Sequence, residues 1–554
     1  MHSHPSPEED DEPLYPTGGA LAYQPTRSGK VYATASSAYQ PSLPPDEITP
    51  RRQAAATDAG IWDETLHANP GSSFEKTLAR AFRLHQAGRS VRVILASGIY
   101  RGSFSAGPAE SDARILIEAA EPGRTIIRGS DVWRDWRDNS GVWHSQWPHK
   151  WGLGSAPDTY GDPNLATADL MRRREMIFVN GHLHRQTLER ACLEPGFFFV
   201  DEANEQILLR PAENFSPREA LVEVGIRSGL IDISGRANLT FRGLRLEHDA
   251  SFYFTPQRAA LQLSGCRNVL VEDCAFQWNN TKGLQIIGSG SEQIVLRRVA
   301  CNHNGCLGIL ASRIGGLVLE NCGTSFNNWR GAWAGKFRGS PCGIKIMRSA
   351  GVTLRGHKAI RNLATGIWID EENRDVRIQN ATVYENYRGI HLEAGGGPAL
   401  VEGSVVVANR QEPLASDFRW SFGSGIAITH MPDVILRDNF IANNDTAQIG
   451  VRDDREKRVI TDGETGEKRA WRSERLTLEG NTIVAGGTRN GLLHVPDAAF
   501  DSGRFLRTFR ADGNAYVGSP EQHGFKVGRL SSAIDFTEWK RLTGQDHRSA
   551  HEQI

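Results

Sequence analysis

Three short stretches decide the fold of this chain: GIKIM at 343–347, GIWID at 366–370 and GIHLE at 389–393. Each stretch begins 23 residues after the one before it, since 366 − 343 = 23 and 389 − 366 = 23. A short apolar strand that returns at a constant interval of about twenty residues is typical of a solenoid, in which every repeat forms one rung. The sequence therefore predicts a stack of parallel strands in this region.

The repeats extend to both sides of these stretches. Recognisable rungs begin at residue 229, and the last strands are expected within 476–487 and 509–518. Most rungs end in an asparagine just before the next strand, so we expect the side-chain amides to stack and hydrogen-bond along the solenoid axis. This predicted ladder has a structural role and comprises Asn279, Asn304, Asn327, Asn362, Asn386 and Asn409.

Alternation along the three strands separates a core face from a polar face. The second and fourth residues of each stretch are Ile or Leu, and we expect them to point into the core. The third and fifth residues point the other way and should lie side by side on an exposed parallel sheet. A substrate-binding face can use such a row, which comprises Lys345, Met347, Trp368, Asp370, His391 and Glu393.

Asp370 and Glu393 occupy the same position in adjacent rungs. Rungs are about 4.8 Å apart, so the two carboxyl groups should come within roughly 5 Å, and the pKa of one of them should rise. A neutral acid beside a carboxylate is what glycoside hydrolysis needs, with about 5–5.5 Å favouring retention and about 6.5–9.5 Å favouring inversion. We favour Asp370 as nucleophile or base and Glu393 as acid, an assignment that the sequence leaves open. The alternative is a polar pair on a solvated sheet face.

Two loops interrupt the regular spacing on either side of this row. Residues 327–341 leave the repeat before the Lys345 strand and residues 411–424 leave it after the Glu393 strand, so both are expected to form walls of a cleft. Trp368 would offer an apolar face to a sugar ring, and the cationic side chains suit an acidic sugar. The loop tryptophans could instead pack the loop onto the solenoid. The predicted substrate-binding residues are Lys345, Trp368, His391, Trp329, Arg330, Trp333, Lys336 and His430.

Two alternatives to hydrolysis stay open. In a polysaccharide lyase, Lys345 or another base would abstract a proton next to a uronate carboxylate, and arginine or calcium would neutralise that carboxylate. In a non-catalytic carbohydrate-binding protein or adhesin, the same face would bind sugar without cleaving it. The hydrolase interpretation requires no cofactor. Calcium remains an option through Glu371, Glu372 and Asp375, although no EF-hand-like spacing supports it.

Five segments are expected along the chain. Residues 1–58 lack apolar periodicity and should be disordered, and residues 59–130 should form an N-terminal cap and the first rungs. The cap is a helix within 72–86, with Ser72 and Glu75 as a capping box and Gly88 at its end. Residues 131–228, which contain five Trp between 133 and 151, should form a loop-rich antiparallel β insertion with a hairpin around 202–205. Residues 229–530 form the solenoid with the cleft, and 531–554 a C-terminal tail.

Composition excludes several classes of protein. The formal net charge of −1 in 554 residues gives no reason to expect nucleic acid or an anionic membrane as a partner, and no run of eighteen apolar residues could span a membrane. The seven cysteines lack zinc-site spacing, so we expect no metal site and interpret them as buried thiols. The start, MHSHPSPEEDDEPLYP, is no signal peptide. An extracellular or periplasmic location is favoured if an export signal is missing from this chain, and a cytoplasmic one otherwise. The oligomeric state is not determined by the sequence.

Several motifs resemble one known group of proteins. They are RREMIFVNG (173–181), SFNNWRG (325–331), GIWIDEEN (366–373), GIHLEAGGGPALVE (389–402) and FTEWKRLTGQDHRS (536–549). Together with the repeats, they are similar to the right-handed parallel β-helix, pectate-lyase-like superfamily and to bacterial β-helix repeat proteins that resemble glycoside hydrolases. The resemblance implies an all-β, right-handed parallel β-helix with an N-terminal helical cap, and a polysaccharide or oligosaccharide partner. It is weak for function, because hydrolases, lyases, epimerases and phage adhesins share the fold. The clustered Asp residues and RIK strand of polygalacturonases are missing.

Overall fold

The computed structural model describes residues 21–25, 31–35, 61–155, 169–212, 216, 218–252, 258–331, 341–411, 422–453, 459–461, 466–485, 491–496, 502–518, 524–528 and 533–552. The chain divides into two compact units. The insertion unit comprises residues 1–46, 131–152 and 175–225, and the solenoid unit comprises residues 47–130, 153–174 and 226–554.

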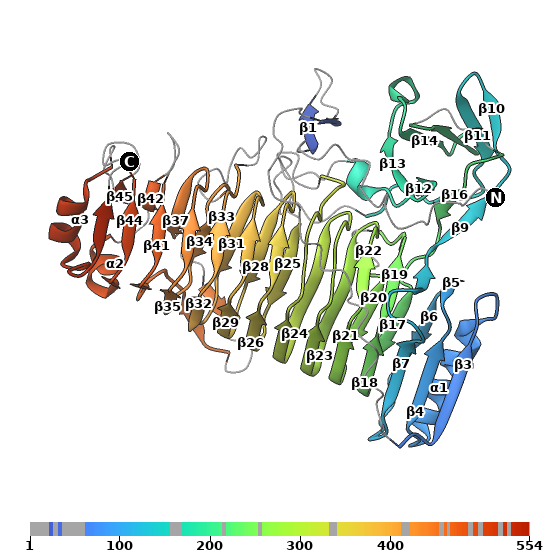
Figure 1. Cartoon of the computed structure of the whole chain (residues 1–554), viewed down its shortest axis with the longest axis horizontal. Coiled ribbons are helices and arrows are strands. Elements are labelled where there is room, and N and C mark those ends of the chain that lie inside the picture. Colours follow the sequence, from blue (N-terminus) through green and yellow to red (C-terminus); the bar gives the residue numbers. More distant parts are fainter. Residues whose placement is uncertain are drawn as a thin grey trace, which may run out of the picture. The chain divides into compact units, whose positions relative to one another are not determined.

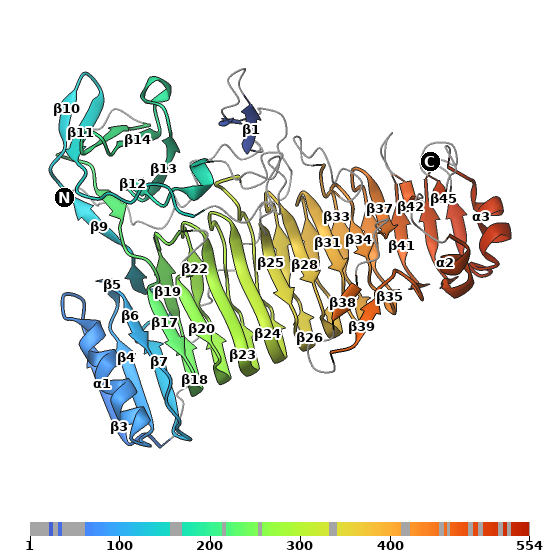
Figure 2. The same ribbon diagram turned by 180° about the vertical axis from the view of Figure 1, so that it is seen from behind.

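The solenoid unit is built from parallel strands that lie side by side, rung after rung, in both views of the molecule (Figures 1 and 2). A rung contains three strands, and each strand pairs with its counterpart in the next rung without a shift in register along most of the unit. Two of the three stacks form one sheet of 23 strands. The predicted all-β parallel solenoid is therefore confirmed.

The three stacks have the following members. The first stack contains β6 (Phe104–Ala106), β17 (Ile231–Ser234), β20 (Leu261–Ser264), the first half of β23 (Lys282–Arg297), the first half of β24 (Leu307–Glu320), β25 (Cys342–Met347), β28 (Thr365–Asp370), β31 (Arg388–Glu393), β34 (Ile426–Thr429), β37 (Ala447–Arg452), β42 (Gly491–Pro496) and β45 (Phe525–Gly528). The second stack contains β3 (Glu64–Ala68), β4 (Val91–Leu95), β7 (Ile115–Ala119), β18 (Ala237–Arg242), β21 (Arg267–Glu272), the second halves of β23 and β24, β26 (Ala350–Arg355), β29 (Arg374–Gln379), β32 (Ala399–Glu402), β35 (Val434–Arg437), β40 (Thr477–Glu479) and β43 (Arg510–Asp512). The third stack contains β5 (Gly98–Arg101), β8 (Thr125–Arg128), β19 (Leu244–Glu247) and β22 (Ala275–Gln277), and further along β27 (Lys358–Ile360), β30 (Thr382–Tyr384), β33 (Val405–Val407), β36 (Phe440–Ala442), β41 (Thr482–Val484), β44 (Ala515–Val517) and β46 (Ala550–Glu552).

The core of the solenoid is a continuous column of aliphatic side chains. In the three diagnostic strands the second and fourth residues lie in this column, fully shielded from solvent, as predicted. Six of the seven cysteines are also buried, and all seven are free thiols, which confirms their interpretation as buried small side chains for all but the half-buried Cys192. Burial of about 0.8 kcal/mol per CH₂ over so many rungs is the main term that holds the unit together.

The predicted asparagine ladder is confirmed. Asn327 Nδ2 donates to Asn362 Oδ1 at 2.9 Å, Asn362 to Asn386 at 2.8 Å, and Asn386 to Asn409 at 3.1 Å, all in buried positions. The ladder also explains the glycine that opens each diagnostic strand. A Cβ at Gly366 would lie 2.8 Å from Asn386 Nδ2 and 3.0 Å from the Gly389 carbonyl oxygen, so only glycine fits between the ladder and the next rung.

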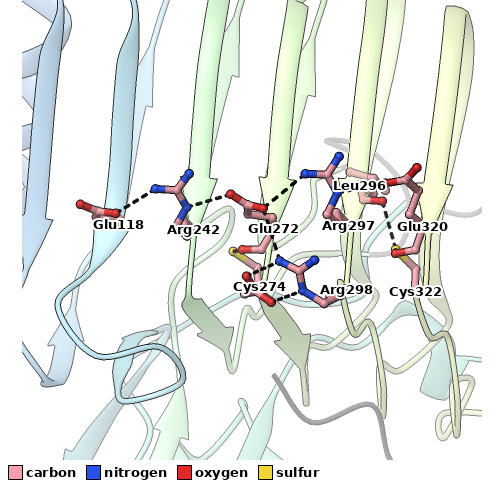
Figure 3. A network of polar contacts seen from close by, with 10 residues as sticks. Glu118, Arg242, Glu272, Cys274, Leu296, Arg297, Arg298, Glu320 and Cys322 are labelled. Atoms are coloured by element: carbon pink, nitrogen blue, oxygen red, sulfur yellow. Dashed lines mark hydrogen bonds and ion pairs between the residues drawn. The ribbon is translucent and has the colours of Figure 1, made fainter. Parts of the chain in front are cut away.

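A second ladder, of alternating charge, runs across the ends of the second-stack strands. Arg242 pairs with Glu118 at 3.2 Å on one side and with Glu272 at 2.8 Å on the other (Figure 3). Arg297 follows, 3.7 Å from Glu272 and 2.9 Å from Glu320. Because each rung offers the opposite charge to the next, parallel stacking brings together partners rather than like charges.

Helices close both ends of the solenoid unit. At the start, α1 (Phe74–Gln86) buries Leu78 and Phe82 against the core, and its N-cap is Ser73, whose Oγ accepts from Lys76 N–H at 3.4 Å. The predicted helix is confirmed, but the cap at Ser72 was wrong by one residue, because Ser72 instead bonds the Asn69 carbonyl oxygen at 2.6 Å. At the other end, α2 (Ser502–Thr508) lies between β42 and β43 in the chain, and α3 (Phe536–Thr543) lies between β45 and β46. Trp539 of α3 is fully buried and stacks on Phe525 at 4.6 Å, so the predicted tail contributes to the core.

The insertion unit is a separate eight-stranded, mostly antiparallel sheet. Its strands lie in the order β10 (Arg137–Asn139), β11 (Val142–Gln146), β15 (Gln206–Arg210), β14 (Phe197–Asp201), β13 (His182–Thr187), β12 (Met176–Val179), β16 (Val222–Gly225) and β9 (Ser130–Trp133). The predicted hairpin is present, since β14 and β15 pair antiparallel with Asp201 opposite Gln206. A short 3₁₀ helix, η3 (Arg190–Cys192), precedes β14.

Two further hairpins complete the description. Strands β1 (Leu21–Pro25) and β2 (Val31–Ala35) pair antiparallel, so the segment expected to be disordered contains one hairpin. The rest of 1–58 lies outside the described residues. Strands β38 (Val459–Thr461) and β39 (Lys468–Ala470) form a further antiparallel pair. Among the residues that the structure describes, no helix is long and apolar enough to cross a membrane.

Candidate functional site

The polar row predicted from the sequence lies on the outward face of the first stack. Lys345 of β25 pairs in register with Trp368 of β28, and Trp368 with His391 of β31. The next pair along the two strands is Ile369 and Leu392. Asp370 and Glu393 follow them and are the last residues of β28 and β31. The structure therefore brings these five residues to one place on the sheet.

Asp370 forms an ion pair within this row. Its Oδ2 lies 2.7 Å from the ammonium nitrogen of Lys345, and the two side chains are only 8 % and 5 % exposed. The other oxygen, Oδ1, is buried and has no hydrogen-bond partner among the described residues. One carboxylate oxygen is thus fixed by a cation, while the other remains available to an incoming group.

Glu393 is held by the two rings next to it. Its Oε2 accepts a hydrogen bond from the Trp368 indole Nε1–H at 3.0 Å and lies 3.4 Å from His391 Nδ1. The other imidazole nitrogen, Nε2, lies 3.2 Å from the hydroxyl of Thr429 on β34. At 19 %, the Glu393 side chain is more exposed than those of Lys345, Asp370 and His391.

The ring of Trp368 is surrounded by polar groups rather than open. The Lys345 ammonium lies 3.7 Å from the ring centroid, which is a close cation–π contact. His391 stacks with the same indole, with 5.7 Å between ring centroids and 30° between ring planes. The expectation that Trp368 offers a free apolar face to a sugar is therefore wrong in this structure, because a cation and a histidine occupy that space. Its indole orients the neighbouring charges instead.

Sequence reasoning missed a buried arginine in this site. The Arg388 guanidinium donates to Thr365 Oγ1 at 2.8 Å and lies 5.1 Å from the Trp368 ring and 4.9 Å from that of Phe422. Burial lowers its pKa to about 10, against the opposing effect of the Glu393 and Asp370 carboxylates. The sequence held a signal, since Arg388 directly precedes the third diagnostic stretch and follows Thr365 at the same interval, 388 − 365 = 23.

An apolar patch borders the polar row on the N-terminal side of its strands. Cys342 packs with Cys306, Leu307 and Trp368, and with Met171 of the 3₁₀ helix η2 (Asp169–Arg172). Burial raises the pKa of the Cys342 thiol well above its usual value, even though the nearby Lys345 acts to lower it. This thiol is therefore a small apolar side chain and no nucleophile.

The row is buried, whereas the sequence predicted an exposed face. Lys345, Trp368, Asp370 and His391 are all at most 8 % exposed, and Glu393 is half-buried. The alternation rule correctly places these side chains outside the hydrophobic core, but it does not tell whether other parts of the chain cover them. A solvated surface pair, the alternative considered for Asp370 and Glu393, does not describe this cluster of two carboxylates and two cations.

The remaining predicted residues have other surroundings. Trp329 is half-buried and its indole N–H donates to the His303 carbonyl oxygen at 2.9 Å, while the buried Arg330 donates to Asn280 Oδ1 and to the Leu170 carbonyl oxygen. His430 is buried in a turn after β34, with Nδ1 3.3 Å from the Trp471 carbonyl oxygen. Trp333 and Lys336 lie outside the described residues.

No candidate metal centre is found in the described residues, since none of their His, Cys, Asp and Glu side chains gather in groups of three or more that could hold an ion. The turn carboxylates considered for calcium are engaged in part: Glu371 pairs with Arg348 at 2.6 Å, and Asp375 lies 3.3 Å from the exposed Arg377.

Comparisons with known proteins agree with this architecture. The family model "Right handed beta helix region" matches residues 259–417. The solved structure "The complex structure of XylC with xylose" is similar to 88 % of this chain and 86 % of its own, with 14 % identity and a TM-score of 0.63. A second match is the A-module of the mannuronan C-5 epimerase AlgE4 from Azotobacter vinelandii, with 13 % identity, 86 % of this chain and 95 % of that chain covered, and a TM-score of 0.46. A third is a structure described as a glycoside hydrolase, with 10 % identity, 87 % of this chain and 99 % of that chain covered, and a TM-score of 0.44. No curated protein matches the chain. The chain is a right-handed parallel β-helix protein, as its motifs led us to expect.

Proposed function

We propose that this protein processes a polysaccharide, and that it does so by hydrolysing a glycosidic bond with Asp370 and Glu393. The observation that carries the proposal is the pair of carboxylates at the ends of two neighbouring strands, each held by a different set of partners. Neighbouring parallel strands are about 4.8 Å apart, and carboxyl groups about 5–5.5 Å apart suit a glycosidase that retains the anomeric configuration.

The surroundings support different roles for the two groups. Asp370 is paired with Lys345 and keeps one oxygen without a partner, as a nucleophile or base requires. Glu393 is more exposed than Asp370, and its Oε2 accepts the Trp368 N–H, which suits the group that donates a proton to the leaving oxygen. Because the site is desolvated, each of these charges acts more strongly on a developing oxocarbenium ion than it would in water.

The fold agrees with this class of substrate. The solved structures that resemble the chain include one in complex with xylose, an alginate-type epimerase and a glycoside hydrolase. They act on or bind carbohydrates by different chemistry, so they support a carbohydrate substrate and leave the reaction to be argued from the residues.

A lyase stays the second candidate, and one observation bears on it. Lys345 and Arg388 place two cations beside the carboxylates, which would suit a uronate. However, the Lys345 ammonium is already engaged by Asp370 and by the Trp368 ring, so a lyase mechanism would need its base elsewhere.

Product analysis distinguishes these functions. The protein is incubated with neutral and acidic polysaccharides, and new reducing ends and the ultraviolet absorbance of unsaturated uronates are measured in parallel. We expect reducing ends without that absorbance, and a loss of at least about a hundredfold in rate for Asp370→Asn and for Glu393→Gln. Asp232→Asn is the matched control, because Asp232 lies on β17 of the same stack but several rungs away. Absorbance that survives both site variants would refute hydrolysis, and binding without any product would indicate a non-catalytic protein.

A further inference from the structure

The insertion unit contains a dense group of aromatic rings that the proposed hydrolysis does not use. We call it the Trp133 cluster and define it as Trp133, Trp136, Trp147, His149 and Trp151. Trp133 lies 6.4 Å from Trp136 and 5.7 Å from Trp147, measured between ring centroids. Trp147 in turn lies 5.1 Å from Trp151, and His149 stacks on Trp151 at 4.6 Å with 15° between the ring planes.

The rings come from strands at both ends of the sheet order and from the segment that follows β11. Trp133 ends β9, Trp136 directly precedes β10, and Trp147 directly follows β11. The backbone N–H of Trp147 donates to the Glu205 carbonyl oxygen at 2.8 Å, which fixes the segment against the β14–β15 turn. The rings therefore belong to strand ends that the sheet holds in place, and they form a rigid arrangement.

Two indole N–H groups of the cluster have no acceptor among the residues that the structure describes. Trp136 is 7 % exposed and Trp147 only 1 %, yet the Nε1–H of each is buried without a hydrogen-bond partner. A buried tryptophan normally finds an acceptor for this group, and leaving it unpaired costs about 1–3 kcal/mol. Two such donors therefore lie within one cluster, without an acceptor among the described residues.

The rings also present area to a ligand. Trp133, His149 and Trp151 are half-buried, so part of each ring remains accessible. Flat aromatic rings that offer an apolar face next to N–H donors suit a sugar, whose C–H face packs on the ring while its hydroxyl oxygens accept hydrogen bonds.

The charges around the cluster favour a neutral sugar. The neighbouring exposed residues alternate in sign, with Arg134 next to Asp135 and Arg137 next to Asp138. Lys150 is neutralised by an ion pair with Glu205 at 3.1 Å. A site for a uronate chain would need an excess of cations, and the segment offers none beyond these balanced groups.

We propose that the Trp133 cluster is a second carbohydrate-binding site, which binds a neutral polysaccharide chain without cleaving it. The site is independent of the carboxylates on β28 and β31, and it gives the protein a way of staying on a polymer between cleavage events. The proposal does not depend on hydrolysis, because a site of this kind binds sugar whatever reaction the solenoid performs.

Affinity electrophoresis of the full-length protein tests the proposal. Native gels contain soluble arabinoxylan, mixed-linkage β-glucan, polygalacturonate or no polysaccharide. We expect retardation in at least one neutral gel and none in polygalacturonate. Trp151→Ala and Trp133→Ala should weaken the apparent affinity by about tenfold or more, which corresponds to about 1.4 kcal/mol. Trp151→Phe keeps an aromatic ring and should retain most of the affinity, so a folding defect of an alanine variant does not decide the result.

Two controls separate this inference from the proposed hydrolysis. Leu188→Ala removes a 44 % exposed apolar side chain of the same unit outside the cluster and should leave retardation unchanged. Asp370→Asn should abolish cleavage and keep retardation. If no neutral gel retards the wild type, or if a folded Trp151→Ala protein is retarded like the wild type, the rings only pack the unit and the inference is wrong. If Asp370→Asn loses retardation instead, binding belongs to the solenoid site.

Discussion

Replacement of Lys345 by methionine tests the central ion pair of the candidate site. Methionine keeps most of the volume of the lysine stem but removes the ammonium 2.7 Å from Asp370. Both side chains are less than a tenth exposed, so the change leaves a desolvated carboxylate with neither oxygen paired among the described residues. Removing one partner of a buried pair costs about 3–5 kcal/mol, and we expect the free energy of unfolding to fall by that amount.

The second half of this test is the double variant. Asp370→Asn in the Lys345→Met background removes the stranded charge, so most of the lost stability should return even though neither charge is present. The double-mutant cycle should therefore give a coupling energy of about 2 kcal/mol or more between the two positions. Stability is measured by urea unfolding followed by tryptophan fluorescence. Arg541→Met is the control, because Arg541 forms a solvent-exposed pair with Glu538, and we expect no measurable change.

One result would refute this reasoning. If Lys345→Met is as mild as Arg541→Met, or if the double variant is less stable than the single one, then Asp370 is not a desolvated charge that depends on Lys345. The argument for Asp370 as a preorganised nucleophile or base would then lose its structural support, even if Asp370→Asn abolishes activity.

Three further predictions concern the solenoid itself. Burial acts to raise the pKa of Glu247, but the guanidinium groups of Arg245 and Arg128 outweigh it and lower the pKa to about 2. The ionised carboxylate therefore contributes about 3 kcal/mol to the free energy of unfolding, and this contribution should be lost as the pH falls from about 4.5 to about 2. Unfolding curves of Glu247→Gln should lack this acid-dependent part. Asn362→Leu removes the amide that hydrogen-bonds Asn327 twice, Thr324 and Asn386, and leaves these buried groups unpaired. Urea unfolding should show a loss of about 2–4 kcal/mol, and a loss below about 0.5 kcal/mol would contradict the ladder's role. Cys342 is fully buried and its thiol pKa is raised, whereas Cys192 is half-buried. Iodoacetamide at pH 8 should therefore label Cys192 first, as detected by mass spectrometry. Early modification of Cys342 would show that its surroundings open readily.

The repeat made much of the solenoid predictable. Because parallel stacking converts a constant interval in sequence into a fixed spacing between rungs, residues 23 apart could be placed side by side from the sequence alone. Lys345, Trp368 and His391 are in register as expected, and the stacking of Asn362 on Asn386 follows from the same rule. The ladder also explains why residue 366 is a glycine, because a Cβ there would clash with the Asn386 amide.

The interactions within the site could not be derived in the same way. The interval predicts which Cα atoms are neighbours, but long side chains also reach partners diagonally. Asp370 lies opposite Met347 in the register, yet it pairs with Lys345, two residues before Met347. Burial depends on parts of the chain that follow no repeat, which is why an exposed row was expected and a covered one is found. Arg388 was not predicted, because it lies just before Gly389 and so outside the five-residue stretches that define the repeat.

The charges of the site explain how a solenoid can bury them. When both carboxyl groups are ionised, Lys345 and Arg388 balance the charges of Asp370 and Glu393, and the acid role proposed for Glu393 requires it to take up a proton before the reaction. Three of the charged side chains are also held by a neutral group: Lys345 and Glu393 by the Trp368 indole, and Arg388 by the hydroxyl of Thr365. Such balance stabilises the resting site, but a reaction that consumes or creates charge on one carboxylate must disturb it. An oxocarbenium-like transition state places a new positive charge on the sugar, next to the two carboxyl groups. The site stabilises this new charge only if the Lys345 and Arg388 cations lie farther from the sugar than the carboxylates do.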